Sequence, residues 1–401
     1  MNKDYFYPLV LEKELKNRIE KLGGRLKEKG IDCCLIAGIS NIYYYTGTIQ
    51  NGVFFCSSDG NSAFFVKKSF ERAKNESGLK NIYPLKGMKN LEEELKNVFG
   101  FSPETIGFEG DILPYSLFKR YEKAFPETKF MDFSLDLRLI RSVKSEWEIE
   151  NIKKAAHQLE KLFEYMKGFI KEGMSEIEIA AESERYVRLL GHQGAIRMRG
   201  FNAELFYSVI CAGESANLPT NFDGPSGSQG LYPSAIHPAG TKKVEKGKPV
   251  LFDFMGAFMG YLCDGTRIYL SGKPSKEIEY AQKKCIEIQN FIAEQLKPGA
   301  IPSEIYTKTV EKAKRENFYE NLMGFKSNQV KFFGHGVGLE VDEFPVIADR
   351  FNFPLEENMV IALEPKKYIE NTGGVGVENT FAVKKGGGEK LINYPDEIIL
   401  I

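Results

Sequence analysis

Long apolar runs are absent from this 401-residue sequence. No stretch approaches the roughly 20 apolar residues that a membrane-spanning helix needs. Residues 1–18 also lack a basic segment followed by an apolar one, which is the pattern of a secretory signal. These absences predict a cytoplasmic protein with no membrane partner.

An excess of charge of either sign is also missing. Lys and Arg number 54 against 55 Asp and Glu, which gives a formal net charge of −1. A chain without a basic excess has little attraction for nucleic acid, so none is expected as a partner. The six cysteines are scattered and form no CxxC pair, which predicts buried, reduced thiols in place of a disulfide framework.

The first part of the chain alternates helical and strand patterns. Residues 11–29 repeat Leu and Ile at steps of three or four, which predicts an amphipathic helix. Residues 31–38 form a short apolar run typical of a buried strand, and residues 51–66 predict a hairpin with its turn at 57–61. With a second helix at residues 90–98, the pattern indicates an α/β domain with a mixed sheet.

The pattern changes near residues 142–144, and we place a domain boundary there, giving domains 1–143 and 144–401. Ser145 precedes acidic residues, as a helix N-cap does, and a long helix is predicted to run to about residue 171.

The second domain is predicted to be α+β, because its further helices are separated from antiparallel strands. These helices are expected at residues 176–190, 275–296 and 303–316. Residues 221–233 are rich in Gly, Ser and Pro and predict a surface loop.

Two predicted hairpins each carry a pair of carboxylates. If the first turns between residues 258 and 259, Asp253 and Asp264 face each other across the ladder. A second hairpin centred on Asn371 places Glu364 opposite Glu378. Facing like charges in apolar strands are unfavourable, so they indicate either a bound metal ion or exposed carboxylates paired with lysines.

His335 lies between two glycines after an apolar run. Glycines allow close approach of the backbone. A lone His is more often a satisfied core residue than a metal ligand. Here, however, four unexplained carboxylates require positive charge, and His335 would add a neutral nitrogen donor to the same metal site.

The order Asp-x10-Asp, Gly-His-Gly-x-Gly, Leu-Glu-Pro and Gly-Val-x-x-Glu resembles the pita-bread metallopeptidases, which include aminopeptidase P, prolidase and methionine aminopeptidase. The first part, notably IDCCLIAGISNIYYYTG, is similar to the creatinase-type N-terminal domain. The resemblance implies an α/β creatinase-type N-terminal domain followed by an α+β pita-bread catalytic domain, and a homodimer.

The resemblance also implies two divalent metal ions per chain. Asp253 would bind one ion, His335 and Glu364 the other, and Asp264 and Glu378 would bridge both. Such a pair activates a water for hydrolysis, with Glu364 as the proton shuttle. This oxygen-rich ligation with one imidazole favours Mn, Fe or Co, and Zn is possible.

Thr266 follows Asp264 by two residues and therefore faces the same side of its strand. We expect it to donate a hydrogen bond that orients the ligands.

The sequence departs from the proline-specific members at two positions. Those enzymes resemble Gly-His-x-x-Gly-x-x-x-His-Glu, but Asp342 replaces the second His. They also commonly carry an Arg two residues before the last ligand, where this chain has Gly376. Asp342 would then bind a substrate amine, or lie near His237 and raise its pKa.

Three further residues are candidates for the substrate pocket. His237 lies sixteen residues before Asp253 and approximates a His that contacts substrate in the proline-specific members; the alternative is an exposed loop residue. Arg197 and Arg199 would replace the missing cation and bind a peptide carboxylate, or they form surface or interdomain salt bridges.

The leading hypothesis is a dinuclear metal-dependent exopeptidase that hydrolyses the N-terminal peptide bond of short peptides, as an Xaa-Pro aminopeptidase or dipeptidase. A second hypothesis is a hydrolase or lyase of the same fold that acts on a small non-peptide substrate, as creatinase does. A third is a non-catalytic binding module, which predicts lost ligands although all five are present.

Overall fold

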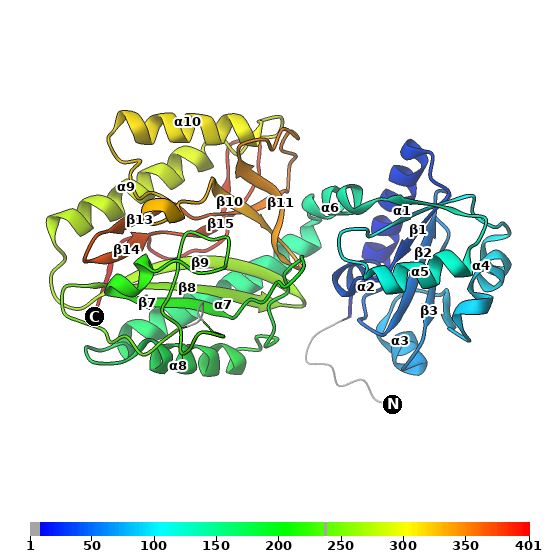
Figure 1. Ribbon diagram of the computed structural model, residues 1–401, viewed down its shortest axis with the longest axis horizontal. Coiled ribbons are helices and arrows are strands. Elements are labelled where there is room, and N and C mark those ends of the chain that lie inside the picture. The colour runs from blue at the N-terminus through cyan, green and yellow to red at the C-terminus, as the bar shows by residue number, and fades with distance from the viewer. Residues whose placement is uncertain (1–8, 236–238) are drawn as a thin grey trace. The chain divides into compact units, whose positions relative to one another are not determined.

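The computed structural model describes residues 9–235 and 239–401 and divides the chain into two compact units (Figure 1). The N-terminal unit comprises Met1–Ile140 with Gly200–Asn202, and the C-terminal unit comprises Arg141–Arg199 with Ala203–Ile401. Within the described ranges, no helix has the length and apolar character to cross a bilayer. All six cysteines are free and buried, as predicted.

The N-terminal unit is built on a mixed six-stranded sheet, which confirms the predicted α/β class. The predicted hairpin of residues 51–66 forms its second and third strands. The strands, in spatial order, are β4 (Ile82–Pro84), β3 (Ser62–Val66), β2 (Gly52–Ser57), β1 (Cys33–Ile36), β5 (Thr105–Phe108) and β6 (Lys129–Asp132).

The first helix, α1 (Glu12–Lys29), buries Leu15, Ile19, Leu22 and Leu26 and ends at Gly30 in the left-handed conformation, which favours glycine. The other helices of this unit are α2 (Ile39–Thr46), α3 (Phe70–Glu76), η1 (Met88–Asn90), α4 (Leu91–Phe99), α5 (Tyr115–Ala124) and the start of α6 (Ser134–Ser142).

The C-terminal unit begins with α7 (Glu146–Phe169), whose N-cap Ser145 exchanges hydrogen bonds with Glu148 in a capping box. This helix packs on strands β8 and β9. The predicted helices are confirmed as α8 (Glu176–Leu189), α9 (Lys276–Ala293) and α10 (Pro302–Arg315); η2 (Gly213–Asn217) and η3 (Lys326–Asn328) are short.

Antiparallel pairing dominates the strands of this unit, as expected for an α+β domain. One sheet has the order β17 (Ile399–Leu400), β9 (Tyr261–Leu270), β8 (Pro249–Phe258), β7 (Ser208–Ala212). A second has the order β11 (Val341–Ala348), β10 (Phe332–Val337), β12 (Val360–Leu363), β15 (Asn379–Ala382), β16 (Glu389–Lys390), and β13 (Lys366–Ile369) pairs with β14 (Gly373–Gly376).

The β8–β9 hairpin turns one residue later than predicted, at Met259 and Gly260, which both have positive φ. Asp253 therefore pairs with Thr266, and Asp264 pairs with Met255. The predicted direct opposition of the two aspartates is wrong. They are diagonal neighbours, but both still project from the same face because side chains alternate along a strand.

The second hairpin has the predicted register. Lys366 pairs with Gly376 in the β13–β14 ladder, and Leu363 pairs with Asn379 in the β12–β15 ladder, so both ladders are centred on Asn371. Glu364 and Glu378 lie between these two ladders, and their positions are also symmetric about Asn371.

Candidate metal centre

His335 lies on β10, whose neighbouring glycines let it pass close to the strands on either side. A Cβ atom on Gly334 would lie 2.3 Å from the carbonyl oxygen of Ala362, and one on Gly336 would lie 2.3 Å from that of Phe344. Only glycine fits at both positions. The β10–β11 register also shifts on either side of His335. The Gly-His-Gly sequence thus places an imidazole ring in a strand that is tightly enclosed.

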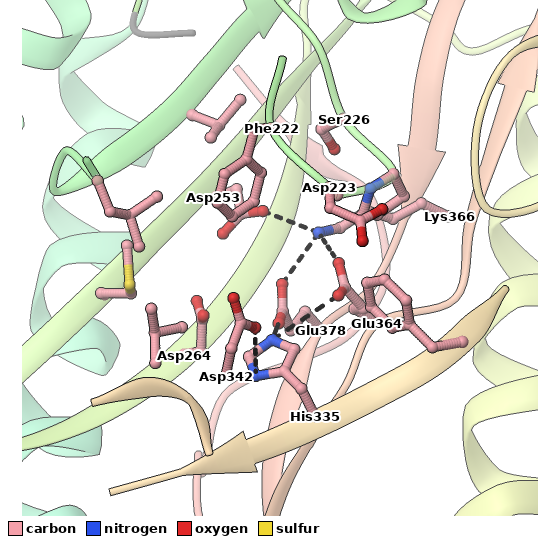
Figure 2. A pocket seen from close by; sticks show the side chains of 17 residues that line it. Phe222, Asp223, Ser226, Asp253, Asp264, His335, Asp342, Glu364, Lys366 and Glu378 are labelled. Carbon is pink, nitrogen blue, oxygen red and sulfur yellow. Dashed lines mark hydrogen bonds and ion pairs between the residues drawn. The ribbon is translucent and has the colours of Figure 1, made fainter. Parts of the chain in front are cut away.

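The five predicted ligands lie in one pocket of the C-terminal unit (Figure 2). Atoms of Asp264, His335 and Glu378 lie within 4.8 Å of one another. The Nε2 atom of His335 is 3.7 Å from Oε1 of Glu364 and 3.9 Å from Oε1 of Glu378. The opposite ring atom, Nδ1, is 3.2 Å from the Gly336 carbonyl oxygen and 3.4 Å from Oδ1 of Asp342. The imidazole is therefore held at Nδ1 and directs Nε2 to the carboxylates.

Lys366 was not predicted to be part of this site. Its ammonium group is buried between three carboxylates, as Figure 2 shows, and donates to Oδ2 of Asp253 at 2.8 Å, Oε2 of Glu364 at 2.7 Å and Oε2 of Glu378 at 3.0 Å. The charges of these carboxylates outweigh the effect of burial, which alone would lower the pKa of Lys366, and hold it well above its ordinary value. An ammonium group has three N–H donors, and all three are used.

Asp264 is the carboxylate without a compensating partner. Its Oδ1 atom is buried and accepts no hydrogen bond from the part of the chain that is described. Burial and then the charges of Glu378 and Asp253 raise the pKa of Asp264 well above its ordinary value. Burial also raises the pKa of Glu378, although Lys366 opposes that shift.

This donor set fits one divalent cation. An unpartnered buried carboxylate oxygen, an oriented imidazole nitrogen and a glutamate oxygen converge, and a cation would remove the repulsion that raises the pKa of Asp264. The site does not fit a second cation equally well. The oxygens that this cation would need from Asp253, Glu364 and Glu378 already accept hydrogen bonds from Lys366.

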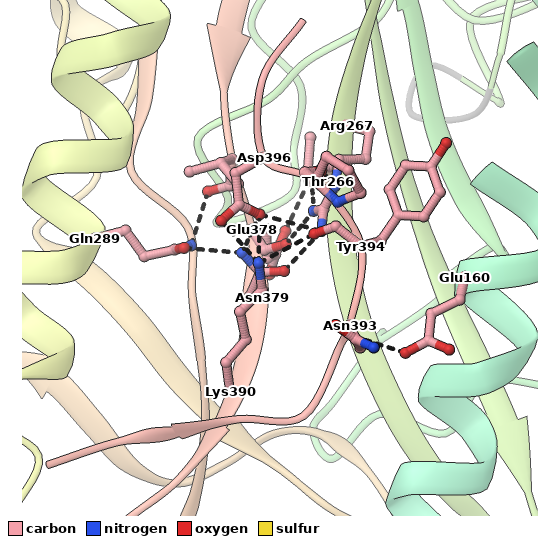
Figure 3. Close-up of polar contacts among 12 residues, drawn as sticks. Glu160, Thr266, Arg267, Gln289, Glu378, Asn379, Lys390, Asn393, Tyr394 and Asp396 are labelled. Atoms are coloured by element: carbon pink, nitrogen blue, oxygen red, sulfur yellow. Dashed lines mark hydrogen bonds and ion pairs between the residues drawn. The ribbon is translucent and has the colours of Figure 1, made fainter. Parts of the chain in front are cut away.

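Glu378 is fixed by β9. Thr266 exchanges backbone hydrogen bonds with it, and the Thr266 hydroxyl donates to Glu378 Oε2 at 2.9 Å. Arg267, which is completely buried, donates to the backbone carbonyls of Thr266 and Glu378 at 2.8 and 3.0 Å, and its ion pair with Asp396 holds the guanidinium in place (Figure 3).

Gln289, from α9, holds the segments that carry both glutamates. Its Nε2 group donates to the carbonyls of Leu363 and Val377, the residues that precede Glu364 and Glu378, and its Oε1 atom accepts from Asn379 at 2.8 Å (Figure 3). The carbonyls of Leu363 and Val377 thus accept hydrogen bonds from a protein side chain.

Neither Arg197 nor Arg199 is among the described residues that line the pocket. The backbone carbonyl of Arg197 accepts from the Val341 N–H, and the Arg199 guanidinium lies 3.9 Å from Glu340. The contact of Arg199 agrees with the alternative in which this residue forms a salt bridge. His237 lies outside the described residues.

Part of the segment 221–233 forms one wall of the pocket, where Phe222, Asp223 and Ser226 are seen in Figure 2. Residues 224–228 are buried, so the prediction of a surface loop is wrong for this part. The Ser226 hydroxyl shares a 2.8 Å hydrogen bond with the Tyr368 hydroxyl, which ties the segment to β13. Asp342 also lines the pocket, with its side chain 35% exposed.

Comparison with known proteins supports the same interpretation. Residues 150–385 match the sequence profile of metallopeptidase family M24, and residues 18–143 match the creatinase/prolidase N-terminal domain. The Xaa-Pro dipeptidase of Pyrococcus furiosus is 29% identical over 387 residues, covering 96% of this chain and 100% of that protein. A Bacillus subtilis protein described as an uncharacterized peptidase is 26% identical over 386 residues, covering 96% of this chain and 100% of that one.

Two solved structures have the same fold. The X-Pro aminopeptidase of Thermotoga maritima superposes with a TM-score of 0.78 at 27% identity, covering 96% of this chain and 99% of that one. The Xaa-Pro dipeptidase of Bacillus anthracis superposes with a TM-score of 0.79 at 27% identity, covering 96% and 100%. The predicted creatinase-type and pita-bread architecture is confirmed.

Proposed function

The chain belongs to metallopeptidase family M24, and from that premise we propose that it removes the N-terminal residue from short peptides, with Xaa-Pro dipeptides among its substrates. The observation that carries the proposal is the convergence of Asp264, His335 and Glu378 on one buried point of the pocket. The sequence and structural relatives named above are peptidases, several of them Xaa-Pro-specific by name. None of them is named for a small non-peptide substrate, so the creatinase-like alternative has no support from them.

The charges of the pocket favour a substrate with a free α-ammonium group. Asp223 and Asp342 line the pocket beyond the ligands, Asp223 is exposed, and Asp342 is the group that replaces the second His of the proline-specific members. Opposite charges at hydrogen-bonding distance attract strongly in a partly desolvated site. We assign both carboxylates to recognition of the peptide N-terminus, and Phe222 to contact with the apolar part of the peptide.

Lewis-acid activation of the scissile carbonyl and of the attacking water is the chemistry that a divalent ion supplies in such a site. Glu364 is the group proposed to take the proton from the water and to deliver it to the departing nitrogen. Its two oxygens face His335 and Lys366, which keep the carboxylate oriented. His237 is retained as a substrate contact on the resemblance alone.

We propose Mn(II), Co(II) or Fe(II) as the metal, with Zn(II) possible, because carboxylates outnumber the single imidazole. A cytoplasmic location and a homodimer are also proposed. The first agrees with six free, buried thiols; the second rests on the resemblance and is tested by light scattering, since a monomer has a mass of 45.4 kDa.

The test is a panel of peptides assayed with Mn(II) and with Co(II). Xaa-Pro dipeptides, Xaa-Pro tripeptides and dipeptides without proline are compared with the same peptides acetylated at the N-terminus. We expect turnover of free peptides only, because acetylation removes the ammonium group. Asp264→Asn is the matched inactive variant. If the protein contains metal by elemental analysis but cleaves no peptide, the proposed function is wrong.

A further inference from the structure

The geometry points to Lys366 as a built-in substitute for one of the two metal ions that the ligand set implies. The protein would then hold one divalent cation, at Asp264, His335 and Glu378, beside a fixed ammonium group. This inference rests on the proposed function for the presence of metal, but it concerns the number of ions and the residue that sets it.

The Lys366 ammonium group occupies the carboxylates of one ion site. Asp253 was expected to bind only one of the two ions, and its Oδ2 atom accepts from Lys366 at 2.8 Å. A dication on this oxygen would lie in contact with the ammonium and repel it. Lys366 is 1% exposed, and its three donors bond to three separate carboxylates, so the group is fully engaged where it lies.

The two glutamates divide their oxygens between Lys366 and His335. In Glu364 and in Glu378, Oε2 accepts from Lys366, whereas Oε1 faces Nε2 of His335. Each carboxylate therefore bridges the ammonium and the His335 side of the pocket, as a bridging carboxylate joins two metal ions. The Oδ1 atom of Asp264, which accepts no hydrogen bond from the described residues, is left to bind the remaining cation.

The β13–β14 hairpin also has no side chain opposite this lysine. Lys366 pairs with Gly376, the position where the proline-specific members commonly carry Arg. A Cβ atom on residue 376 would lie 2.7 Å from Lys366 Cα and 3.0 Å from its Cγ. The cation missing from β14 is thus replaced by one on β13, and the Lys366 side chain adds to the backbone crowding at residue 376.

The charges have a consequence for substrate binding. Four carboxylates face one dication and one ammonium group, which leaves one negative charge. A substrate that brings its own cation, such as a free α-ammonium group, is favoured by this imbalance.

The experiment counts metal ions per folded chain. Wild type, Lys366→Ala and the matched control Lys367→Ala are saturated with Mn(II), freed of excess metal by gel filtration and analysed for their metal content. Lys367 is the adjacent lysine of β13, but its Nζ atom donates to backbone carbonyls of residues 318 and 320, away from the site. We expect one ion per chain in wild type and in Lys367→Ala, and two in Lys366→Ala.

Two ions in wild type, or only one in Lys366→Ala, would overturn the inference. If Lys366→Ala does not fold, the electron paramagnetic resonance spectrum of Mn(II)-loaded wild type decides: an isolated six-line signal supports the inference and an exchange-coupled signal contradicts it. Neither measurement depends on turnover. One ion with no peptide cleavage would leave the count standing and reject the proposed function, and two ions with cleavage would do the reverse.

Discussion

Lys366 and Gly376 face each other across the β13–β14 ladder, and only one of the two positions has room for a side chain. The nearest obstacle to a Cβ atom on residue 376 is the backbone carbonyl oxygen of Pro365, at 2.5 Å. The backbone segment that positions the Lys366 ammonium group in the metal centre therefore admits only glycine opposite it.

Gly376→Arg is expected to destabilise the C-terminal unit by about 1–3 kcal/mol, the usual cost of overpacking a buried position. Lys366→Gly is destabilising on its own, because it leaves Asp253, Glu364 and Glu378 without their ammonium partner. Combined with Gly376→Arg it should cost less than the sum of the two separate losses, because it removes the Cγ contact, although not the contact with Pro365. Urea unfolding followed by the fluorescence of Trp147, the only tryptophan and part of α7, measures the coupling.

Gly386→Ala is the control for the hairpin variants, since a Cβ atom at that position meets nothing within 4 Å. Strictly additive effects of the two hairpin substitutions would show that Lys366 and residue 376 do not compete for space.

Asp264→Asn and Asp253→Asn are expected to change metal-free stability in opposite directions. Asp264 has an unpartnered oxygen and is repelled by Glu378 and Asp253, so removing its charge should raise the free energy of unfolding by about 1 kcal/mol. Asp253 pairs with Lys366, so neutralising it should lower stability. Both are measured by urea unfolding in the presence of a chelator.

Metal binding should be lost in Asp264→Asn, which separates ligand function from stability. A metal-free Asp264→Asn protein that is less stable than wild type would mean that the Asp264 carboxylate is already well compensated.

Much of the arrangement of the metal centre could be predicted from the sequence, and each wrong prediction has a physical cause. The register of the second hairpin was predictable because Asn371 and the glycines that follow it indicate a turn centred on Asn371. The first hairpin was misplaced by one residue because the glycines at 256 and 260 both suggest a turn that spans 256–260. Gly256 is not part of the turn: a Cβ atom there would lie 2.2 Å from the carbonyl oxygen of Ala155 in α7, so this glycine permits helix packing. The actual turn uses Met259 at positive φ, which its residue type does not signal.

Lys366 could have been found from the sequence, because it lies two residues after Glu364, and side chains two residues apart in an extended segment project to the same side. Arg267 and Gln289 could not, since their roles depend on backbone carbonyls that come together only in the folded chain.

Thr266→Val is expected to weaken metal binding by roughly 10-fold, the lower end of the effect of removing a hydrogen bond to a ligand. Valine has nearly the same shape but cannot donate to Glu378 Oε2. Thr266→Ser keeps the hydroxyl and should bind metal with nearly wild-type affinity. Isothermal titration with Mn(II) measures both variants, and equal affinities for them would show that the Glu378 carboxylate is oriented by its other contacts.

Glu343→Gln is expected to destabilise the C-terminal unit at neutral pH. Glu343 accepts from Arg141, and its Oε2 atom lies 3.0 Å from Lys144 Nζ, with all three side chains buried. Burial opposes ionisation, but the two cations outweigh it and lower the pKa of Glu343 to about 2. Against an ordinary value near ~4.3, this shift corresponds to roughly 3 kcal/mol of stability.

The sign of the pH dependence follows, because a carboxyl whose pKa is lower in the folded state stabilises the fold above its unfolded pKa. This stability is lost as the pH falls from about 4.3 toward the folded pKa near 2. Wild type should therefore lose more stability between pH 7 and pH 3 than Glu343→Gln does, when unfolding is followed by Trp147 fluorescence. Glu357→Gln, at an exposed position of the same unit, should keep the wild-type pH dependence. Parallel pH profiles for wild type and Glu343→Gln would show that the ion pair with Arg141 and Lys144 does not carry this part of the acid sensitivity.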